Sequence, residues 1–264
     1  MNVIETIRTR KSIRNYDNLP LTDTETRAIQ SAIDGTSSPF GGKATIRLQK
    51  FETRGKLKPG TYSVISGAGS FLLMAYADSE KNELSAGYML EKIILDATAL
   101  SLGTCWLGGT FSNSDFDRNQ IWPEGETLKI VSPIGHSSGR TSLLERLERL
   151  AVNSASRKPF GELFFHNDFN TPLQPDDTCF GLALEMLRLA PSSLNRQPWR
   201  ALVCDNEIHF YYRNNASRPV LDCGIALCHF HATQLHKGNG GIFFKTDDAP
   251  EPPSGLSYLI SFKN

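Results

Sequence analysis

The amino-acid sequence lacks several features that would place it in a specialised class of protein. It has no surplus of charge, because 28 basic residues balance 28 acidic residues among its 264 residues. A field that would recruit nucleic acid or an anionic membrane is therefore not expected. No apolar run approaches the roughly 18 residues that cross a bilayer, and the first residues lack the apolar core of a signal peptide. These absences predict a cytoplasmic protein with no nucleic-acid and no membrane partner.

Cysteine is scarce and shows no pattern of a metal site. The five cysteines are scattered, and the five-residue spacing of Cys223 and Cys228 matches no known ligand motif. An odd number of such cysteines fits reduced thiols that pack as small core residues. The sequence also lacks a Gly-x-Gly-x-x-Gly segment, a P-loop and any pattern of a Ser-His-Asp triad. We therefore expect no metal and no catalytic side chain.

Helical and strand patterns alternate along the chain, which predicts a mixed α+β protein. Thr22 and Glu25 form a capping-box pattern for a helix that continues to about Ile33. Further helices are predicted at 2–15, at 85–103 with its end at Gly103, at 176–190 with Asp176 or Asp177 as its cap, and at 222–238. Helix 85–103 is apolar almost all round, so we expect it to be buried at a seam. Strands are predicted at 44–51, which alternates like an edge strand, at 70–77, which has the pattern of a buried strand, and at 128–136, 200–205, 207–213 and 257–262.

Two pairs of segments indicate an internal duplication. The letters "DATALSLG" (96–103) and "HATQLHKG" (231–238) share Ala-Thr, Leu and Gly at an offset of 135. The segment "GTSSPFGG" (35–42) matches the start of "APSSLNRQPW" (190–199), with the Ser-Ser pairs 155 apart. Unequal offsets are expected of an old duplication that has since gained and lost residues. We therefore predict two halves, residues 1–150 and 151–264, that form a pseudo-dimer in one chain.

Three segments carry side chains suited to ligand binding. In "RKSIR" (10–14), Arg can donate two parallel hydrogen bonds to a phosphate, Lys offers a point charge and Ser a neutral donor. The segment "SRKP" (156–159) is similar. Each could instead be an ordinary exposed basic stretch. Residues 190–199, the 190–199 corner, combine a Pro-Ser-Ser turn with Asn195, which favours backbone N–H groups that point outward. The alternative is a simple turn from a helix into a strand.

Two glycines follow the apolar helix in "LGTCWLGGTF" (102–111). Glycine lets the backbone approach a planar ligand closely, and a free N–H can then donate to a ring nitrogen. A helix cap followed by a bulge would give the same letters, so this segment alone does not decide between a ligand site and a turn.

Together these segments, "RKSIRNY" (10–16), "ALSLGTCWLGG" (99–109), "SRKP" and "APSSLNRQPW", resemble the nitroreductase family, flavoproteins that carry FMN at a two-fold dimer interface. The likeness covers nearly the whole chain and is greatest to members with two fused halves. It implies a nitroreductase-like α+β fold in which the second half acts as the partner subunit. The FMN-binding residues that it implies are Arg10, Lys11 and Ser12 at the phosphate and ribityl chain, Gly108 or Gly109 (with Leu107 beside them) near flavin N5, Arg157 or Lys158 returning to the phosphate, and Pro191, Ser192, Ser193 and Asn195 from the other half.

The second site of the pseudo-dimer is expected to be degenerate. In the 35–42 corner, Thr36 replaces the proline and Phe40 replaces the asparagine. In the second half, Pro159 stands at the place of Ser12, and proline has no N–H to donate. We therefore expect about one FMN per chain, in a monomer that mimics a homodimer and that could form a higher oligomer.

The resemblance implies an FMN-dependent oxidoreductase that passes hydride from NAD(P)H to a small electron-poor acceptor such as a nitroaromatic or a quinone. Nothing in the sequence distinguishes NADH from NADPH. One alternative is a flavin-binding sensor or storage protein without turnover, which would keep the same segments but close the flavin face. Another is a cofactor-free interaction protein, which would be colourless.

Overall fold

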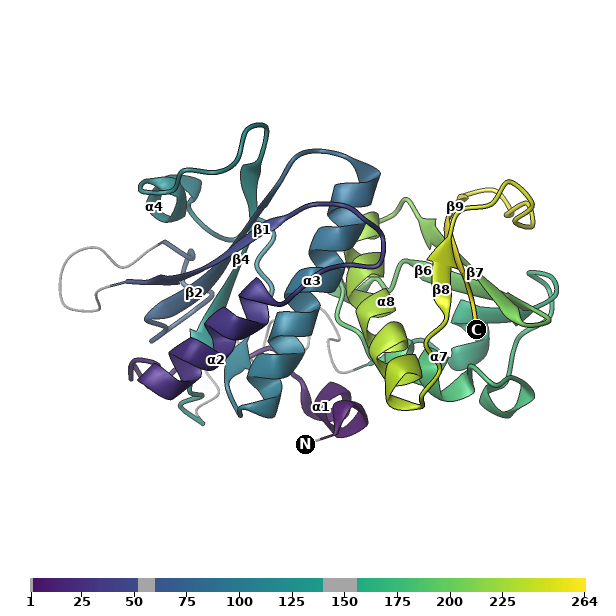
Figure 1. Cartoon of the computed structure of the whole chain (residues 1–264), viewed down its shortest axis with the longest axis horizontal. Coiled ribbons are helices and arrows are strands. Elements are labelled where there is room, and N and C mark those ends of the chain that lie inside the picture. The colour runs from purple at the N-terminus through teal and green to yellow at the C-terminus, as the bar shows by residue number, and fades with distance from the viewer. Residues whose placement is uncertain (1, 52–59, 140–155) are drawn as a thin grey trace.

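The computed structural model describes residues 2–51, 60–139 and 156–264, and it shows two sheets separated by a pair of helices. The long helices α3 (Glu80–Ala99) and α8 (Pro219–His236) pack against each other at the centre, and one sheet lies on the outer side of each helix (Figure 1). This arrangement confirms the predicted α+β class. Among the described residues, no helix is both long and apolar enough to cross a membrane.

The first sheet is antiparallel and has the order β1-β2-β4-β3. Strand β2 is buried throughout, whereas β1 is an edge strand, as the sequence predicts. Helix α2 begins at the predicted capping box, in which the Glu25 N–H donates to Thr22 Oγ1 over 3.2 Å. The bounds of these elements are α2 (Asp23–Asp34), β1 (Thr45–Lys50), β2 (Ser70–Tyr76), β3 (Gly103–Thr104), α4 (Asn113–Asp117) and β4 (Thr127–Gly135).

The second sheet has the order β5-β6-β7-β9-β8, with β5 parallel to β6 and the other pairs antiparallel. The strands predicted at 200–205, 207–213 and 257–262 correspond to three of its members. Its elements are α6 (Phe160–Leu163), β5 (Phe164–His166), the 3-10 turn η1 (Pro175–Asp177), α7 (Gly181–Arg188), the 3-10 turn η2 (Ser193–Asn195), β6 (Trp199–Cys204), β7 (Glu207–Arg213), β8 (Ile242–Phe244) and β9 (Leu256–Lys263). The predicted boundary between residues 150 and 151 lies outside the described residues.

Two predicted helices are shorter in the structure. Helix α1 (Val3–Thr9) ends before Arg10, and the following residues are extended because the Ile13 N–H donates to Thr104 O over 2.8 Å. In the second half, α7 begins at Gly181 without a side-chain cap, so the prediction of Asp176 or Asp177 as its cap was wrong. A Cβ at Gly181 would lie 1.8 Å from Pro175 O, so only glycine fits at this position.

The prediction that Gly103 ends the central helix was also wrong. Helix α3 ends at Ala99, and the left-handed residue that follows is Ser101 (φ 62°). Gly103 instead lies in β3, where a Cβ would approach Ile13 Cγ1 to 2.7 Å, so the glycine makes room for the extended segment after α1. After α8 the equivalent left-handed position is occupied by a glycine, Gly238 (φ 80°).

The two central helices make a reciprocal contact, which fixes how the halves correspond. A Cβ on Gly87 of α3 would lie 2.2 Å from Leu221 O, and one on Gly224 of α8 would lie 2.2 Å from Leu84 O. Such reciprocity is the property of a two-fold interface. Gly224 follows Gly87 by 137 positions, and Gly238 follows Ser101 by the same number. This geometry is consistent with the predicted duplication, with an offset of 137 in these helices instead of the 135 that the shared letters suggest.

Candidate functional site

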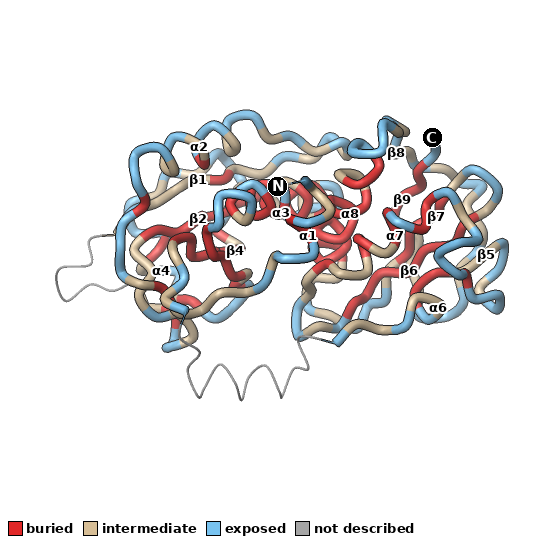
Figure 2. Tube along the Cα trace, turned by 90° about the horizontal axis from the view of Figure 1, so that it is seen from below, coloured by how far each residue is buried: buried red, intermediate tan, exposed pale blue. Residues whose placement is uncertain are grey.

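The predicted binding segments meet around the seam between α3 and α8. Helix α1 (Val3–Thr9) lies next to α3 and α8 in the view from below (Figure 2). Its Ile7 belongs to a buried cluster with Tyr88 of α3, Met186 of α7 and Cys228 of α8. Because α1 touches elements of both halves, the residues that follow it begin at the junction between the halves. Arg10, the first of them, caps the end of α1 through its N–H to Thr6 O (2.9 Å).

A fully buried carboxylate, Glu91 of α3, joins three elements of this junction. Its Oε2 accepts from Trp106 Nε1 over 2.8 Å, and its Oε1 lies 2.8 Å from His229 Nε2 and 3.7 Å from Arg10 Nε. The other nitrogen of His229 lies 3.1 Å from Met186 O, which can only accept, so Nδ1 carries a hydrogen. Glu91 therefore links the end of α1, the loop after β3 and helix α8.

Arg157 contacts the 190–199 corner and lies near Arg10 of the first-half basic segment. Its Nη2 donates to Leu189 O over 3.0 Å and its Nη1 to Asn195 Oδ1 over 3.3 Å. Burial lowers the pKa of Arg157 to about 10, and the positive charges of Arg10 and Arg188 lower this pKa as well. Arg10 and Arg157 are thus close enough for their charges to repel. Arg10 of residues 1–150 and Arg157 of residues 151–264 therefore lie near each other.

The neighbours of these arginines also carry charge. Arg188 pairs with Glu185 at 2.6 Å and donates to Lys158 O over 3.1 Å. Burial lowers the pKa of Lys158, as do the charges of Arg200 and Arg213. Lys11 is exposed beside Arg10, and Ser12 pairs with Thr104 of β3.

The 190–199 corner has an unusual backbone. Leu194, Asn195 and Gln197 have φ values of 50°, 54° and 49°. Left-handed conformations of residues other than glycine cost of the order of 1–3 kcal/mol each, so surrounding contacts must hold them. Gln197 supplies several, because its N–H donates to Ser192 Oγ (2.9 Å) and its Oε1 accepts from the Lys158 N–H (2.9 Å). Pro191 and Ser192 are partly buried, whereas Ser193 is exposed.

Each half has such a corner, and the two corners attach to equivalent positions of the central helices. The Ser193 N–H lies 3.1 and 3.2 Å from the two carboxylate oxygens of Asp222 on α8. In the first half, Ser38 Oγ donates to Ser85 Oγ of α3 over 2.7 Å. Asp222 follows Ser85 by 137 positions, the offset that relates the helices. Neither Asp222 nor Glu91 stands in a motif, so the sequence analysis did not identify them.

The glycine pair after β3 lies in an exposed loop, in which a Cβ on Gly108 would lie 3.5 Å from Ile130 Cδ1. Leu107 is buried, and its N–H donates to Val131 O of β4 over 2.9 Å. Gly108 and Gly109 are exposed, and a Cβ on Gly109 would meet no described atom within 4 Å. Packing within the described part of the chain therefore does not require glycine at position 109.

Aromatic rings occupy the 35–42 corner. Phe40 packs edge-to-face on Tyr88 and Phe243, with ring centroids 5.5 and 5.0 Å apart. The hydroxyl oxygen of Tyr88 in turn lies 2.7 Å from His231 Nδ1. The first-half counterpart of Asn195 is therefore part of an aromatic cluster.

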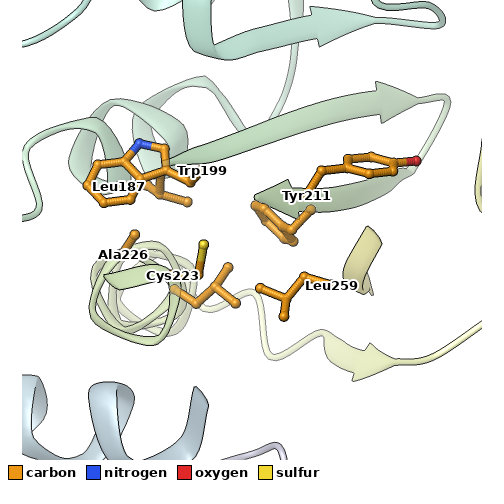
Figure 3. Close-up of a pocket in the computed structure, with 8 residues that line it drawn as sticks. Leu187, Trp199, Tyr211, Cys223, Ala226 and Leu259 are labelled. Atoms are coloured by element: carbon orange, nitrogen blue, oxygen red, sulfur yellow. The ribbon is translucent and has the colours of Figure 1, made fainter. Parts of the chain in front are cut away.

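A small gap in the second-half core does not belong to this site. Its lining is almost wholly apolar, and it has no room for a water molecule. The labelled lining side chains converge between α7, α8 and the second sheet; they are Leu187, Trp199, Tyr211, Cys223, Ala226 and Leu259 (Figure 3). This gap is a packing defect of the core.

Comparisons with known proteins identify the family. A family model described as "Putative TM nitroreductase" matches residues 2–234. A solved structure titled a putative nitroreductase from Thermotoga maritima MSB8 has a TM-score of 0.65 at 18% identity, and the match covers 100% of this chain and 94% of that one. An FMN complex from Desulfovibrio desulfuricans has a TM-score of 0.40 at 23% identity, over 55% of this chain and 94% of that one. An FMN-bound nitroreductase from Bacteroides fragilis has a TM-score of 0.42 at 16% identity, over 54% and 92%. No curated protein matches the chain. Because the family model covers most of its residues, this protein belongs to that nitroreductase family.

Proposed function

We propose that the protein is an FMN-dependent oxidoreductase that takes hydride from NAD(P)H and reduces a small electron-poor acceptor such as a nitroaromatic or a quinone. The observation that carries the proposal is the meeting of Arg10 from the first half with Arg157 and Asn195 from the second. FMN, when bound, supplies the hydride chemistry, so the protein has to supply position, charge and shelter from water.

The charges at the junction suit the phosphate end of FMN. Arg10 and Arg157 raise the local positive potential, and an anion placed between them would relieve their repulsion. Glu91 Oε1 lies 3.7 Å from Arg10 Nε, and we assign the two Nη groups of Arg10 to the phosphate. Lys11, Ser12 and Lys158 are proposed to add a charge or a donor at the same end.

The glycine loop and the 190–199 corner suit the ring end. Leu107 is held on β4 by a backbone hydrogen bond, so the glycine pair follows a fixed point, and Gly109 adjoins open space. We assign them to flavin N5. Pro191, Ser192, Ser193 and Asn195 would approach the same flavin from the second half, as a partner subunit would.

The proposal includes about one FMN per chain. Phe40 and its aromatic neighbours occupy the counterpart of the Asn195 region, and Pro159 has no N–H to offer a phosphate. A single chain, 1–150 and 151–264 acting as two fused halves, would then complete one site as a cytoplasmic monomer.

The visible spectrum of the purified protein and the amount of flavin that it releases test this function. We expect a yellow protein that releases about one FMN per chain and loses its colour anaerobically on addition of NADH or NADPH. The colour should return when a quinone or nitroaromatic is added. A yellow protein that neither donor bleaches would indicate flavin storage or sensing, and a protein that takes up no FMN would contradict the proposal.

A further inference from the structure

Among the described residues, a buried carboxylate attaches the 190–199 corner to α8. Asp222 is only 3% exposed, and both of its oxygens face the Ser193 N–H, at 3.1 and 3.2 Å. The residues directly after Ser193 have left-handed backbones at Leu194 and Asn195. A corner with such a backbone keeps its shape only if its neighbours hold it.

The other half of the molecule shows that a carboxylate is not needed merely to attach a corner. At the equivalent position of α3, Ser85 holds the 35–42 corner with a neutral hydroxyl group, which accepts from Ser38 Oγ (2.7 Å) and from the Gly42 N–H (3.0 Å). A buried carboxylate costs more to desolvate than a hydroxyl group does. The carboxylate therefore occurs in the half whose corner has the Pro-Ser-Ser-x-Asn sequence.

We propose that Asp222 is a positioning residue whose ionised carboxylate holds the 190–199 corner in its FMN-binding shape, and that protonation of Asp222 loosens the corner and weakens FMN binding. This inference rests on the proposed function. It adds a proton-dependent control of cofactor binding that acts through the corner of the second half.

The groups around Asp222 favour its protonation near neutral pH. Burial raises its pKa to about 7, the Ser193 N–H lowers this pKa, and the negative charge of Glu83 on α3 raises it. Glu83 itself faces Arg218, whose Nη1 donates to Tyr76 OH over 2.9 Å. On α8 the adjacent Cys223 faces Arg200 of β6, and the pKa of its thiol is raised by burial and by Asp222.

The variant Asp222→Asn mimics the protonated acid in shape and charge, so its effect should depend on pH. FMN is titrated into the flavin-free full chain, and the dissociation constants of variant and wild type are compared at pH 8 and pH 6. We expect binding about tenfold weaker in the variant at pH 8, because a charge-assisted hydrogen bond is replaced by a neutral one. At pH 6 the two constants should agree within about twofold. Protonation of the FMN phosphate affects both proteins equally and cancels in the ratio.

Two further variants keep the test sharp. Ser85→Ala removes the equivalent contact of the other corner and should leave FMN affinity within about twofold at both pH values. Glu83→Gln removes a negative charge that faces Asp222. The FMN affinity of this variant should therefore decline at a lower pH than that of wild type. If Asp222→Asn does not fold, the pH dependence of FMN affinity in Glu83→Gln still tests the role of Asp222.

The outcomes separate this inference from the function on which it rests. A ratio that is the same at pH 8 and pH 6, or an equal loss in Ser85→Ala, would overturn the role of Asp222 while leaving FMN binding intact. A Glu83→Gln profile with an unchanged midpoint would do the same. A wild-type protein that binds no FMN at either pH would instead contradict the proposed function.

Discussion

Glu91 of α3 and His229 of α8 meet across the seam at 2.8 Å, and both side chains are fully buried. This contact joins the two halves of the chain, and through Arg10 and Trp106 it also orders the walls of the candidate site. Removing one member of such a group leaves the other buried with fewer partners, which is costly.

Loss of His229 should therefore destabilise the whole fold. We expect His229→Ala to lower the free energy of unfolding by about 3 kcal/mol, measured by urea denaturation at pH 7. His209→Ala is the matched control, because His209 is also buried but its Nδ1 lies beside the neutral Ser261 Oγ (2.7 Å). Its loss should be smaller by at least about 1 kcal/mol. Equal losses in the two variants would show that the contact of His229 with Glu91 adds nothing.

The close approach of α3 and α8 predicts that neither central glycine tolerates a methyl group. A Cβ on Gly87 or Gly224 would lie 2.2 Å from a carbonyl oxygen of the other helix, so the helices would have to separate. Gly87→Ala and Gly224→Ala should each cost about 2 kcal/mol or more in thermal or urea unfolding. Gly109→Ala, whose Cβ meets no described atom within 4 Å, should change stability by less than about 0.5 kcal/mol. A harmless Gly224→Ala would contradict the reciprocal contact.

The raised pKa of Asp222 predicts a pH dependence of stability. In the folded chain this pKa is about 7, against an ordinary value of 3.8, so between these values the folded state holds a proton that the unfolded state has lost. The contribution of Asp222 to stability is therefore full below about pH 4 and falls as the pH rises to 7. Asp222→Asn should unfold at the same urea concentration as wild type near pH 4, and should be more stable by about 2–4 kcal/mol at pH 8. A variant that is less stable than the flavin-free wild type at pH 8 would show the opposite sign.

The end of α3 offers a stabilising substitution. Ser101 has a left-handed backbone (φ 62°), and its counterpart after α8, Gly238 (φ 80°), already has the residue that adopts this conformation without strain. Ser101→Gly should raise the free energy of unfolding by about 0.5–1 kcal/mol, and Gly238→Ala should lower it by about 1 kcal/mol. Thermal denaturation of the two variants beside wild type measures both changes. A Ser101→Gly variant of lower stability would refute this account of the helix end.

Much of the fold could be predicted from local patterns. The Thr22–Glu25 capping box, the buried strand at 70–77 and the two apolar helices depend on residues that are close in sequence, so their letters suffice. The errors arose where distant contacts decide. Ile13 pairs with Thr104 and so ends α1 early, and Ile13 also explains why position 103 is glycine.

The candidate site shows the same division. Its basic segments and the 190–199 corner were visible as letters and as a family resemblance. The contacts of Arg157 with Asn195 and of Ser193 with Asp222 join residues that are 38 and 29 positions apart. Glu91 and His229 are separated by 138 positions, and a lone buried carboxylate or histidine in a helix has no local signature. The three-dimensional structure was needed to find them.

The central claim is that arginines of both halves hold the phosphate of one FMN. The most direct test compares the affinities of FMN and riboflavin, which lacks the phosphate, in Arg10→Ala, Arg157→Ala and the control Arg118→Ala, whose side chain is largely exposed on the first half. We predict that Arg10→Ala and Arg157→Ala each bind FMN at least tenfold more weakly than wild type, with riboflavin affinity changed by less than about twofold and the control unaffected. Unchanged FMN affinity in either arginine variant, or an equal loss for both flavins, would contradict the claim.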